Sequence, residues 1–246
     1  MNLVLDLGNS RCKWALANDS LTQGGALAYG EDFARALDNN FSALPRPEHV
    51  VAVCVAASGH LQTMAQWVQH RWDLELQRVV TRTAQLGVTN AYKDPMSLGA
   101  GRWAALVAAH ARLSGAACVV DCGTALTIDT LDQNGVYRGG VILPGVARMR
   151  DALLRTQGVR EVSGDAGSAL AQSTADGVAA GTLFGLAGAI DRILDEQAAL
   201  LGATPQILIT GGDAQPLFAL LRHAVQYTPD LVLEGVARIA RAGGSA

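Results

Sequence analysis

The sequence has few cysteines, few charged residues and few aromatic residues, and these shortages exclude several classes of protein. Four cysteines and five histidines in 246 residues are too few and too scattered for a disulfide scaffold or a zinc site. Charged residues make up 17% of the chain and the formal net charge is -3, so we expect no nucleic-acid partner. The glycine-rich uncharged stretch 177–190 has 14 residues. A membrane-spanning helix needs roughly 20, so we expect no membrane insertion.

Two common nucleotide motifs are also missing. The sequence contains neither a Walker A motif nor a dinucleotide-binding GxGxxG fingerprint. It begins MNLVLDLGNS, with no basic leader, and we therefore expect a cytoplasmic protein. Half of the residues are hydrophobic, which is enough to bury the core of one large domain or of two modest ones.

An internal repeat organises the chain. The segment LVLDLGNSRCKWAL (3–16) matches CVVDCGTALTIDTL (118–131) at an offset of 115 residues, so Asp6 aligns with Asp121. In both segments an apolar strand ends in Asp-x-Gly and a second strand follows, which predicts a hairpin in each half. The alternative is coincidence in a chain rich in alanine and glycine.

Further strands and helices extend the repeat. Strands are predicted at 50–55 and 206–210, and helices at 102–113, 177–202 and 216–224. Strands followed by alternating helices and strands are typical of α/β proteins. The pattern predicts two domains, 1–115 and 116–246. Four glycines recur on one face of the helix at 177–202, which predicts close packing against another helix, between domains or between subunits.

The Asp-x-Gly turns are candidate phosphate sites. Glycine allows a tight turn, backbone N–H groups after it bind anions, and an aspartate at the strand end suits Mg²⁺. One such turn alone is more often an ordinary hairpin connection. Two of them in duplicated halves predict a cleft that holds ATP with a divalent ion.

Four longer motifs follow one another along the chain. They are D-L-G-N-S-R-C-K at 6–13, D-P-x-S-L-G-A-G-R-W at 94–103, D-C-G-T-A-L-T-I-D at 121–129 and G-G-V-I-L-P-G at 139–145. Shorter ones lie at 173–174, 210–213 and 231–235. In this order the motifs resemble those of the type III pantothenate kinases, a family that includes the Bordetella-type accessory factor proteins. The resemblance runs from residue 3 to about 240.

The resemblance implies a duplicated ribonuclease H-like/actin-like ATPase fold, with two α/β domains around a nucleotide cleft. It implies phosphorylation of pantothenate by ATP, the first step of coenzyme A biosynthesis, with Mg²⁺ as a cofactor. It further implies that Asp121 holds a monovalent cation (K⁺ or NH₄⁺). It also implies a homodimer in which Thr174 reaches the partner's site. The implied ATP-binding residues are Asp6, Leu7, Gly8, Asn9, Ser10, Arg11, Cys12, Lys13 and Thr124, and the implied pantothenate-binding residues are Tyr92, Gly99, Ala100, Gly101, Arg102 and Thr174.

One position departs from the family pattern. Members of the family carry Gly-x-Asp-Arg, with the aspartate as proton acceptor, whereas this chain has Gly101 at that position. Either the chain is a catalytically weakened, regulatory relative that binds nucleotide and pantothenate, or another group such as Asp94 substitutes, or the glycine is an introduced residue. Ser97 is expected to cap the helix that carries Arg102, whose charge suits the carboxylate of pantothenate.

Overall fold

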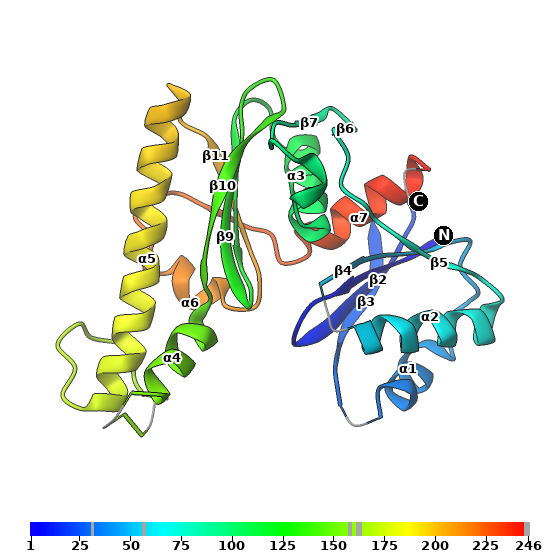
Figure 1. The fold of residues 1–246 in the computed structure, drawn as a ribbon, viewed down its shortest axis with the longest axis horizontal. Coiled ribbons are helices and arrows are strands. Elements are labelled where there is room, and N and C mark those ends of the chain that lie inside the picture. Colours follow the sequence, from blue (N-terminus) through cyan, green and yellow to red (C-terminus); the bar gives the residue numbers. More distant parts are fainter. Residues whose placement is uncertain (31, 56–57, 157–158, 161–163, 244–246) are drawn as a thin grey trace. The chain divides into compact units, whose positions relative to one another are not determined.

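The computed structural model of the chain describes residues 1–30, 32–55, 58–156, 159–160 and 164–243 (Figure 1). They form two compact units, one of Met1–Arg112 with the segment from Asp230 onward, and one of Leu113–Pro229. The predicted domains, 1–115 and 116–246, divide the chain at nearly the same place but assign the C-terminal segment to the second domain. Helix α7 (Leu231–Arg241) accounts for the difference, since it packs against helix α3 (Ala100–Arg112) of the first unit.

The first unit contains a five-stranded sheet in the order β3-β2-β1-β4-β5. Strand β1 runs antiparallel to β2 and parallel to β4, so a hairpin is followed by a crossover. The strands are β1 (Asn2–Leu7), β2 (Arg11–Ala17), β3 (Leu21–Ala28), β4 (Val50–Cys54) and β5 (Leu76–Arg78). An antiparallel pair, β6 (Ala84–Gln85) with β7 (Val88–Asn90), follows in the chain and precedes the 3₁₀ helix η1 (Pro95–Ser97).

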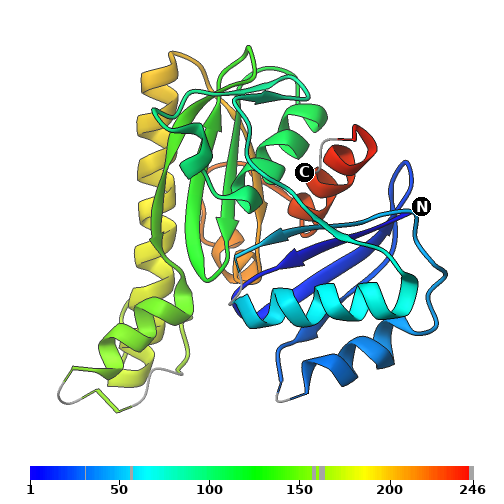
Figure 2. The same ribbon diagram turned by 45° about the vertical axis from the view of Figure 1, so that its right-hand side comes forward.

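Helices cover both faces of this sheet. Helices α1 (Phe33–Phe41) and α2 (Ser58–Trp72) cover one face, as Figure 2 shows. Alternate residues of β1, Leu3, Leu5 and Leu7, point into the core that these two helices close. Helices α3 and α7 pack on each other and on β1 and β4, which gives the unit three layers.

The second unit repeats the strand topology of the first. Its strands lie in the order β12-β11-β8-β9-β10, with β8 antiparallel to β9 and parallel to β11. They are β8 (Ala117–Cys122), β9 (Ala125–Leu131), β10 (Val136–Pro144), β11 (Gln206–Thr210) and β12 (Gln226–Tyr227). Each half is therefore the same unit, a hairpin followed by parallel strands, and the predicted repeat is confirmed.

Three helices complete the second unit. They are α4 (Val146–Leu154), α5 (Thr174–Leu201) and α6 (Ala214–Phe218). Leu186, Ile190 and Leu194 of α5 pack into the core formed by the sheet. The predicted helix at 216–224 is wrong in extent, because α6 ends at Phe218 and the backbone N–H of Arg222 donates to Asp191 of α5.

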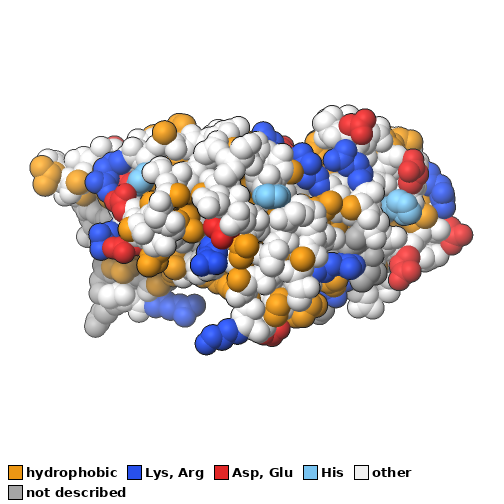
Figure 3. All heavy atoms as spheres, turned by 90° about the horizontal axis from the view of Figure 1, so that it is seen from above, with side chains coloured by type: hydrophobic (Ala, Val, Ile, Leu, Met, Phe, Trp, Pro, Cys, Tyr) orange, Lys and Arg blue, Asp and Glu red, His pale blue; other side chains and the backbone are white. Residues whose placement is uncertain are grey.

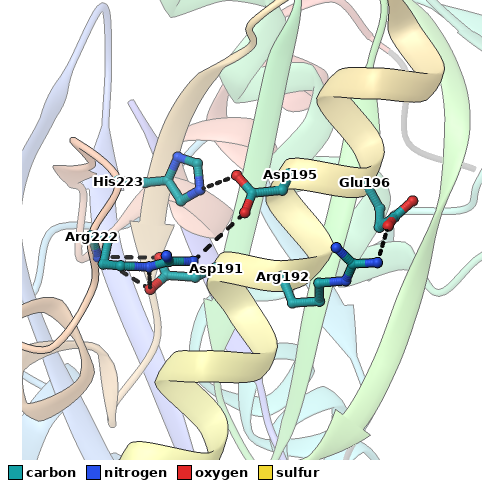
Figure 4. A network of polar contacts seen from close by, with 6 residues as sticks. All are labelled: Asp191, Arg192, Asp195, Glu196, Arg222 and His223. Carbon is teal, nitrogen blue, oxygen red and sulfur yellow. Dashed lines mark hydrogen bonds and ion pairs between the residues drawn. The ribbon is translucent and has the colours of Figure 1, made fainter.

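Asp191 and Arg222 belong to a polar network that joins α5 to the segment after α6 (Figure 4). Asp191 is buried, with 3% of the residue exposed. Its carboxylate accepts two hydrogen bonds from Arg222, one from the backbone N–H at 3.1 Å and one from the side-chain Nε at 3.1 Å. Asp195 pairs with His223 at 3.0 Å. The residues that follow these two aspartates in α5, Arg192 and Glu196, form an exposed ion pair within the helix.

We expect Asp191→Ala to lower the free energy of unfolding by about 2–3 kcal/mol, because it removes a buried carboxylate that accepts both the backbone N–H and the side-chain Nε of Arg222. The matched control is Glu196→Ala, which breaks the exposed ion pair and should cost about 0.5 kcal/mol or less. Urea denaturation of both variants measures the difference. Equal costs would mean that Asp191 does not anchor the Arg222 segment.

The glycine face of α5 has open space beside it. A Cβ atom built at Gly181, Gly185 or Gly188 meets nothing within 4 Å in the part of the chain that the structure describes. Helix α5 is also the one described helix with the length and hydropathy of a membrane span, and half of that apolar window is buried inside the protein. A buried core helix of a globular protein can have the same length and hydropathy.

Positive and negative side chains are interspersed on the face shown in Figure 3. Lysine and arginine side chains lie there among acidic, neutral and apolar ones. This face therefore carries charge of both signs.

Candidate active site

The first Asp-x-Gly turn joins β1 to β2. The backbone N–H of Gly8 donates to the carbonyl of Arg11 at 3.1 Å, which closes the turn. Asn9, Ser10 and Arg11, in and just after the turn, are exposed. Asp6 lies directly opposite Lys13 in the hairpin register. The structure therefore brings the predicted phosphate loop together in one hairpin with an acid and a lysine at its base.

Two members of the predicted loop have buried side chains. Leu7 and Cys12 are fully buried and belong to the core under α1 and α2. Burial, with the nearby Asp6 carboxylate, raises the pKa of the Cys12 thiol to about 12, so the thiol stays neutral. Only the main-chain groups of these two residues are available to a ligand.

Asp6 is a strongly perturbed acid. Its pKa is raised from 3.8 to about 6, mainly by burial, although Lys13 and Arg11 pull it down. Burial disfavours the ionised form of this carboxylate at the end of β1, and a bound cation would stabilise that form. Its partner Lys13 also lines a cavity of about 350 Å³ together with β3 and the residues around the start of α7, Asp230 and Leu233. The cavity lies within the first unit, beside the phosphate loop.

The second Asp-x-Gly turn joins β8 to β9 in the second unit. Asp121 and Thr124 are half-buried, and Asp121 lies next to Thr210 of β11 in the parallel register. The backbone N–H of Asp213 donates to the Cys122 carbonyl at 3.0 Å. Burial, with the Asp121 and Asp213 carboxylates, raises the pKa of the Cys122 thiol to about 12. The turn thus has two carboxylates beside it, and Asp213, which ends the match at 210–213, is the one that the predicted site residues did not include.

Two glycines outside this turn pack closely against its backbone. A Cβ at Gly145, between β10 and α4, would clash with the carbonyl of Gly123 and lie 2.8 Å from that of Thr124. A Cβ at Gly211 would lie 2.6 Å from the Cys122 backbone nitrogen, and Gly211 also has a φ of +99°. These approaches are to backbone atoms, so neither glycine tolerates a side chain without displacing the turn.

The predicted substrate residues Tyr92 and Arg102 lie together in the first unit. Arg102 Nη2 donates to the Tyr92 hydroxyl at 3.4 Å, and the guanidinium carbon lies 6.0 Å from the Tyr92 ring centre. Arg102 is in the first turn of α3, whose backbone N–H groups favour anions. The pair and the helix end form a positively polarised surface suited to a carboxylate.

The predicted helix cap is wrong. Helix α3 begins at Ala100, and the Gly99 carbonyl accepts the Trp103 N–H at 3.0 Å. Ser97 instead ends η1, where its hydroxyl donates to the carbonyl of Asp94 at 2.6 Å. The carboxylate of Asp94 caps η1 by accepting the Met96 N–H at 3.1 Å.

Gly101 is the second residue of α3 and has room for a side chain. A Cβ atom built there meets nothing within 4 Å in the described part of the chain. Its neighbour in sequence is Arg102, which contacts Tyr92. Gly101 is therefore next to the candidate substrate surface and sterically open.

Thr174 is the exposed first residue of α5, in the second unit. Ser173 caps the helix, since its hydroxyl oxygen accepts the Asp176 N–H at 3.1 Å. The Ser173 hydroxyl also donates to the Asp176 carboxylate at 2.7 Å, which lowers the pKa of that carboxyl. Thr174 is thus held at a well-capped helix start.

Residues 2–196 of the sequence match the family model for type III pantothenate kinase. The chain belongs to this family. A type III pantothenate kinase from Alkalilimnicola ehrlichii is 40% identical over 245 residues, which cover 98% of each chain. The match spans both units, so it is a relationship between entire chains.

Solved structures show the same fold at lower identity. One described as a Baf family transcriptional activator from Campylobacter jejuni aligns with a TM-score of 0.60 and 22% identity over 98% of each chain. The activator of a 2-hydroxyisocaproyl-CoA dehydratase from Clostridium difficile aligns with a TM-score of 0.58 and 12% identity, covering 99% of this chain and 95% of that one. The predicted class, a duplicated ribonuclease H-like/actin-like ATPase fold, is confirmed.

Proposed function

We propose that this type III pantothenate kinase family member transfers the terminal phosphoryl group of ATP to pantothenate, the first step of coenzyme A biosynthesis. The observation that carries the proposal is the 40% identity to a type III pantothenate kinase over 98% of the chain. The Tyr92–Arg102 pair at the start of α3 supports it, because pantothenate carries a carboxylate that this cationic surface would bind.

Within this proposal the phosphate loop 6–13 binds the ATP phosphates through backbone N–H groups and Lys13, and Thr124 contacts the nucleotide from the second turn. Phosphoryl transfer passes through a loose transition state, so positioning and charge stabilisation contribute most of the rate. Gly99, Ala100 and Arg102 would bind pantothenate beside Tyr92. Their roles follow from the family pattern and from the contacts around α3.

The residues at the two turns fit the expected cations. Among the described residues no group of three or more His, Cys, Asp or Glu forms a metal cage. Mg²⁺ in kinases needs only one or two carboxylates besides waters and phosphates, which Asp6 supplies, and Asp121 offers a carboxylate to K⁺ or NH₄⁺. A bound divalent cation would neutralise charge on the phosphates.

We propose that the protein works in the cytoplasm as a homodimer, without a nucleic-acid or membrane partner. The open glycine face of α5 and the exposed Thr174 at its start support a second copy beside this helix. In the family pattern Thr174 completes the pantothenate site of the partner. Light scattering would then give about twice the 25.6 kDa mass of the chain.

A coupled assay for ADP with ATP, Mg²⁺, K⁺ and pantothenate tests the proposed function. We expect ADP formation that needs pantothenate and both cations, and that stops when either cation is removed. The competing proposal, a nucleotide- and pantothenate-binding protein with little turnover, rests on Gly101. Calorimetry distinguishes the outcomes: binding of both ligands with slow turnover favours that proposal, and absence of pantothenate binding contradicts both.

A further inference from the structure

The segment between β7 and α3, residues 91–99, carries Tyr92 but has little apolar anchoring. Ala91, Lys93 and Asp94 are exposed, and Met96 is 63% exposed. Leu98 is the residue of this segment with a fully buried side chain, at 2% exposure. Keeping a backbone residue in one conformation costs roughly 1–2 kcal/mol of entropy, so such a segment needs other interactions to stay ordered.

Asn90, the last residue of β7, holds the first part of this segment. Its side chain is buried, with 6% of the residue exposed. Oδ1 accepts the N–H of Tyr92 at 3.1 Å, and Nδ2 donates to the Pro95 carbonyl at 3.0 Å. The Asn90 backbone N–H donates to the Thr83 carbonyl at 2.8 Å, so the residue is itself anchored.

Thr81 holds the other end. This threonine is 4% exposed, and its hydroxyl donates to the carbonyl of Leu98 at 2.7 Å. Leu98 directly precedes Gly99, where the first hydrogen bond of α3 is accepted. The two buried side chains therefore set the place of Tyr92 and of the helix start that carries Arg102.

We propose that Asn90 and Thr81 are positioning residues for pantothenate, acting through the segment 91–99; this rests on the proposed function. Neither side chain needs to touch the substrate. When their hydrogen bonds are removed, the segment must be ordered at the moment of binding, and that cost appears as lost affinity. The ATP phosphate loop lies on other strands, so ATP affinity should not change.

Thr81 allows an isosteric test. Thr81→Val keeps the shape and removes the donor, whereas Thr81→Ser keeps the donor. The matched control is Thr182→Val in α5, a threonine that is 3% exposed and donates to the Val178 carbonyl at 2.7 Å. Asn90→Leu removes both side-chain hydrogen bonds of the first anchor.

Calorimetry on the full chain then measures pantothenate and ATP binding separately. We expect the pantothenate Kd to rise about fivefold in Thr81→Val, because one lost hydrogen bond weakens a binding equilibrium by roughly this factor. In Asn90→Leu two hydrogen bonds are lost, and the pantothenate Kd should rise about tenfold or more. ATP Kd should stay within about twofold, and Thr81→Ser and Thr182→Val should bind pantothenate like the native chain. Faster amide hydrogen exchange at Tyr92 in the two weakened variants should accompany the loss.

Two results would overturn the inference. Unchanged pantothenate affinity in Thr81→Val and Asn90→Leu would show that the anchors do not position the substrate segment, while leaving the proposed function intact. A parallel loss in Thr182→Val, or equal weakening of ATP binding, would reveal a general loss of stability. If the native chain binds no pantothenate, the proposed function fails as well, so the two failures are distinguishable.

Discussion

Gly101→Asp is expected to raise turnover by about two orders of magnitude or more, because a positioned general base typically contributes about 10²- to 10⁴-fold. The structure has room for the new side chain, since a Cβ at this position meets nothing within 4 Å in the described residues. An aspartate in the first turn of α3 also interacts favourably with the helix dipole, and it replaces a glycine that disfavours the helix. The change should therefore preserve the fold.

The control for this variant is Gly101→Asn, which has nearly the same size but cannot accept the proton. We expect it to leave turnover low, so that the gain is attributable to the carboxylate. Pantothenate should bind at least as well to the native chain as to Gly101→Asp, because the native site lacks an anion near the substrate carboxylate. The coupled assay and calorimetry on the three proteins measure both effects.

Robust turnover in the native chain that Gly101→Asp does not improve would mean that another residue acts as the base. Asp94 is then the first to replace. Its carboxylate already accepts the Met96 N–H at 3.1 Å and lies on an exposed turn. Because Asp94→Asn keeps an oxygen acceptor for that N–H, it would test the base with little disturbance of η1.

Asp6→Asn is expected to abolish most turnover while stabilising the protein. Loss of one preorganised charged group at a phosphoryl-transfer site typically costs about 10²-fold or more. In the folded protein the pKa of Asp6 is about 6, above its ordinary value of 3.8. Above pH 6 the native state therefore contains an ionised carboxylate that is costly to bury, and asparagine removes this cost.

The sign of the pH dependence follows from the raised pKa. Between pH 3.8 and about 6 the native state binds more protons at Asp6 than the unfolded state, so the native chain loses stability as the pH rises. The gain from Asp6→Asn should hence grow over this range and reach its full size above pH 6, at no more than about 3 kcal/mol. Urea denaturation at pH 5 and pH 8 measures it, and turnover is measured in the Gly101→Asp background.

A matched control is Asp151→Asn on the exposed surface of α4, which should change neither stability nor turnover. A loss of stability in Asp6→Asn at pH 8 would contradict the assigned burial cost. Unchanged turnover would contradict the role of Asp6 in the phosphate loop. The two readouts thus test the electrostatic and the functional parts of the argument separately.

Several local features were predictable from the sequence. Strand 206–210 and both Asp-x-Gly hairpins appear where predicted, because strand alternation and turn residues act between neighbours in the chain. Ser97 was wrongly predicted to cap α3, although the sequence contains a local signal for a separate short helix before it. Asp94 before Pro95 is the usual arrangement of a helix cap and first residue, and it marks η1.

The sequence by itself determined the α/β class, the duplication and the identity of the residues at the two turns, since these follow from short patterns of apolar, acidic and glycine residues. Tertiary structure decided where α7 packs, because an apolar helix face does not specify which sheet it will cover. It also decided that Asp6 is hard to ionise and that Asn90 and Thr81 anchor the segment around Tyr92. Burial and buried hydrogen bonds depend on contacts between residues distant in the chain, and local sequence patterns do not contain them.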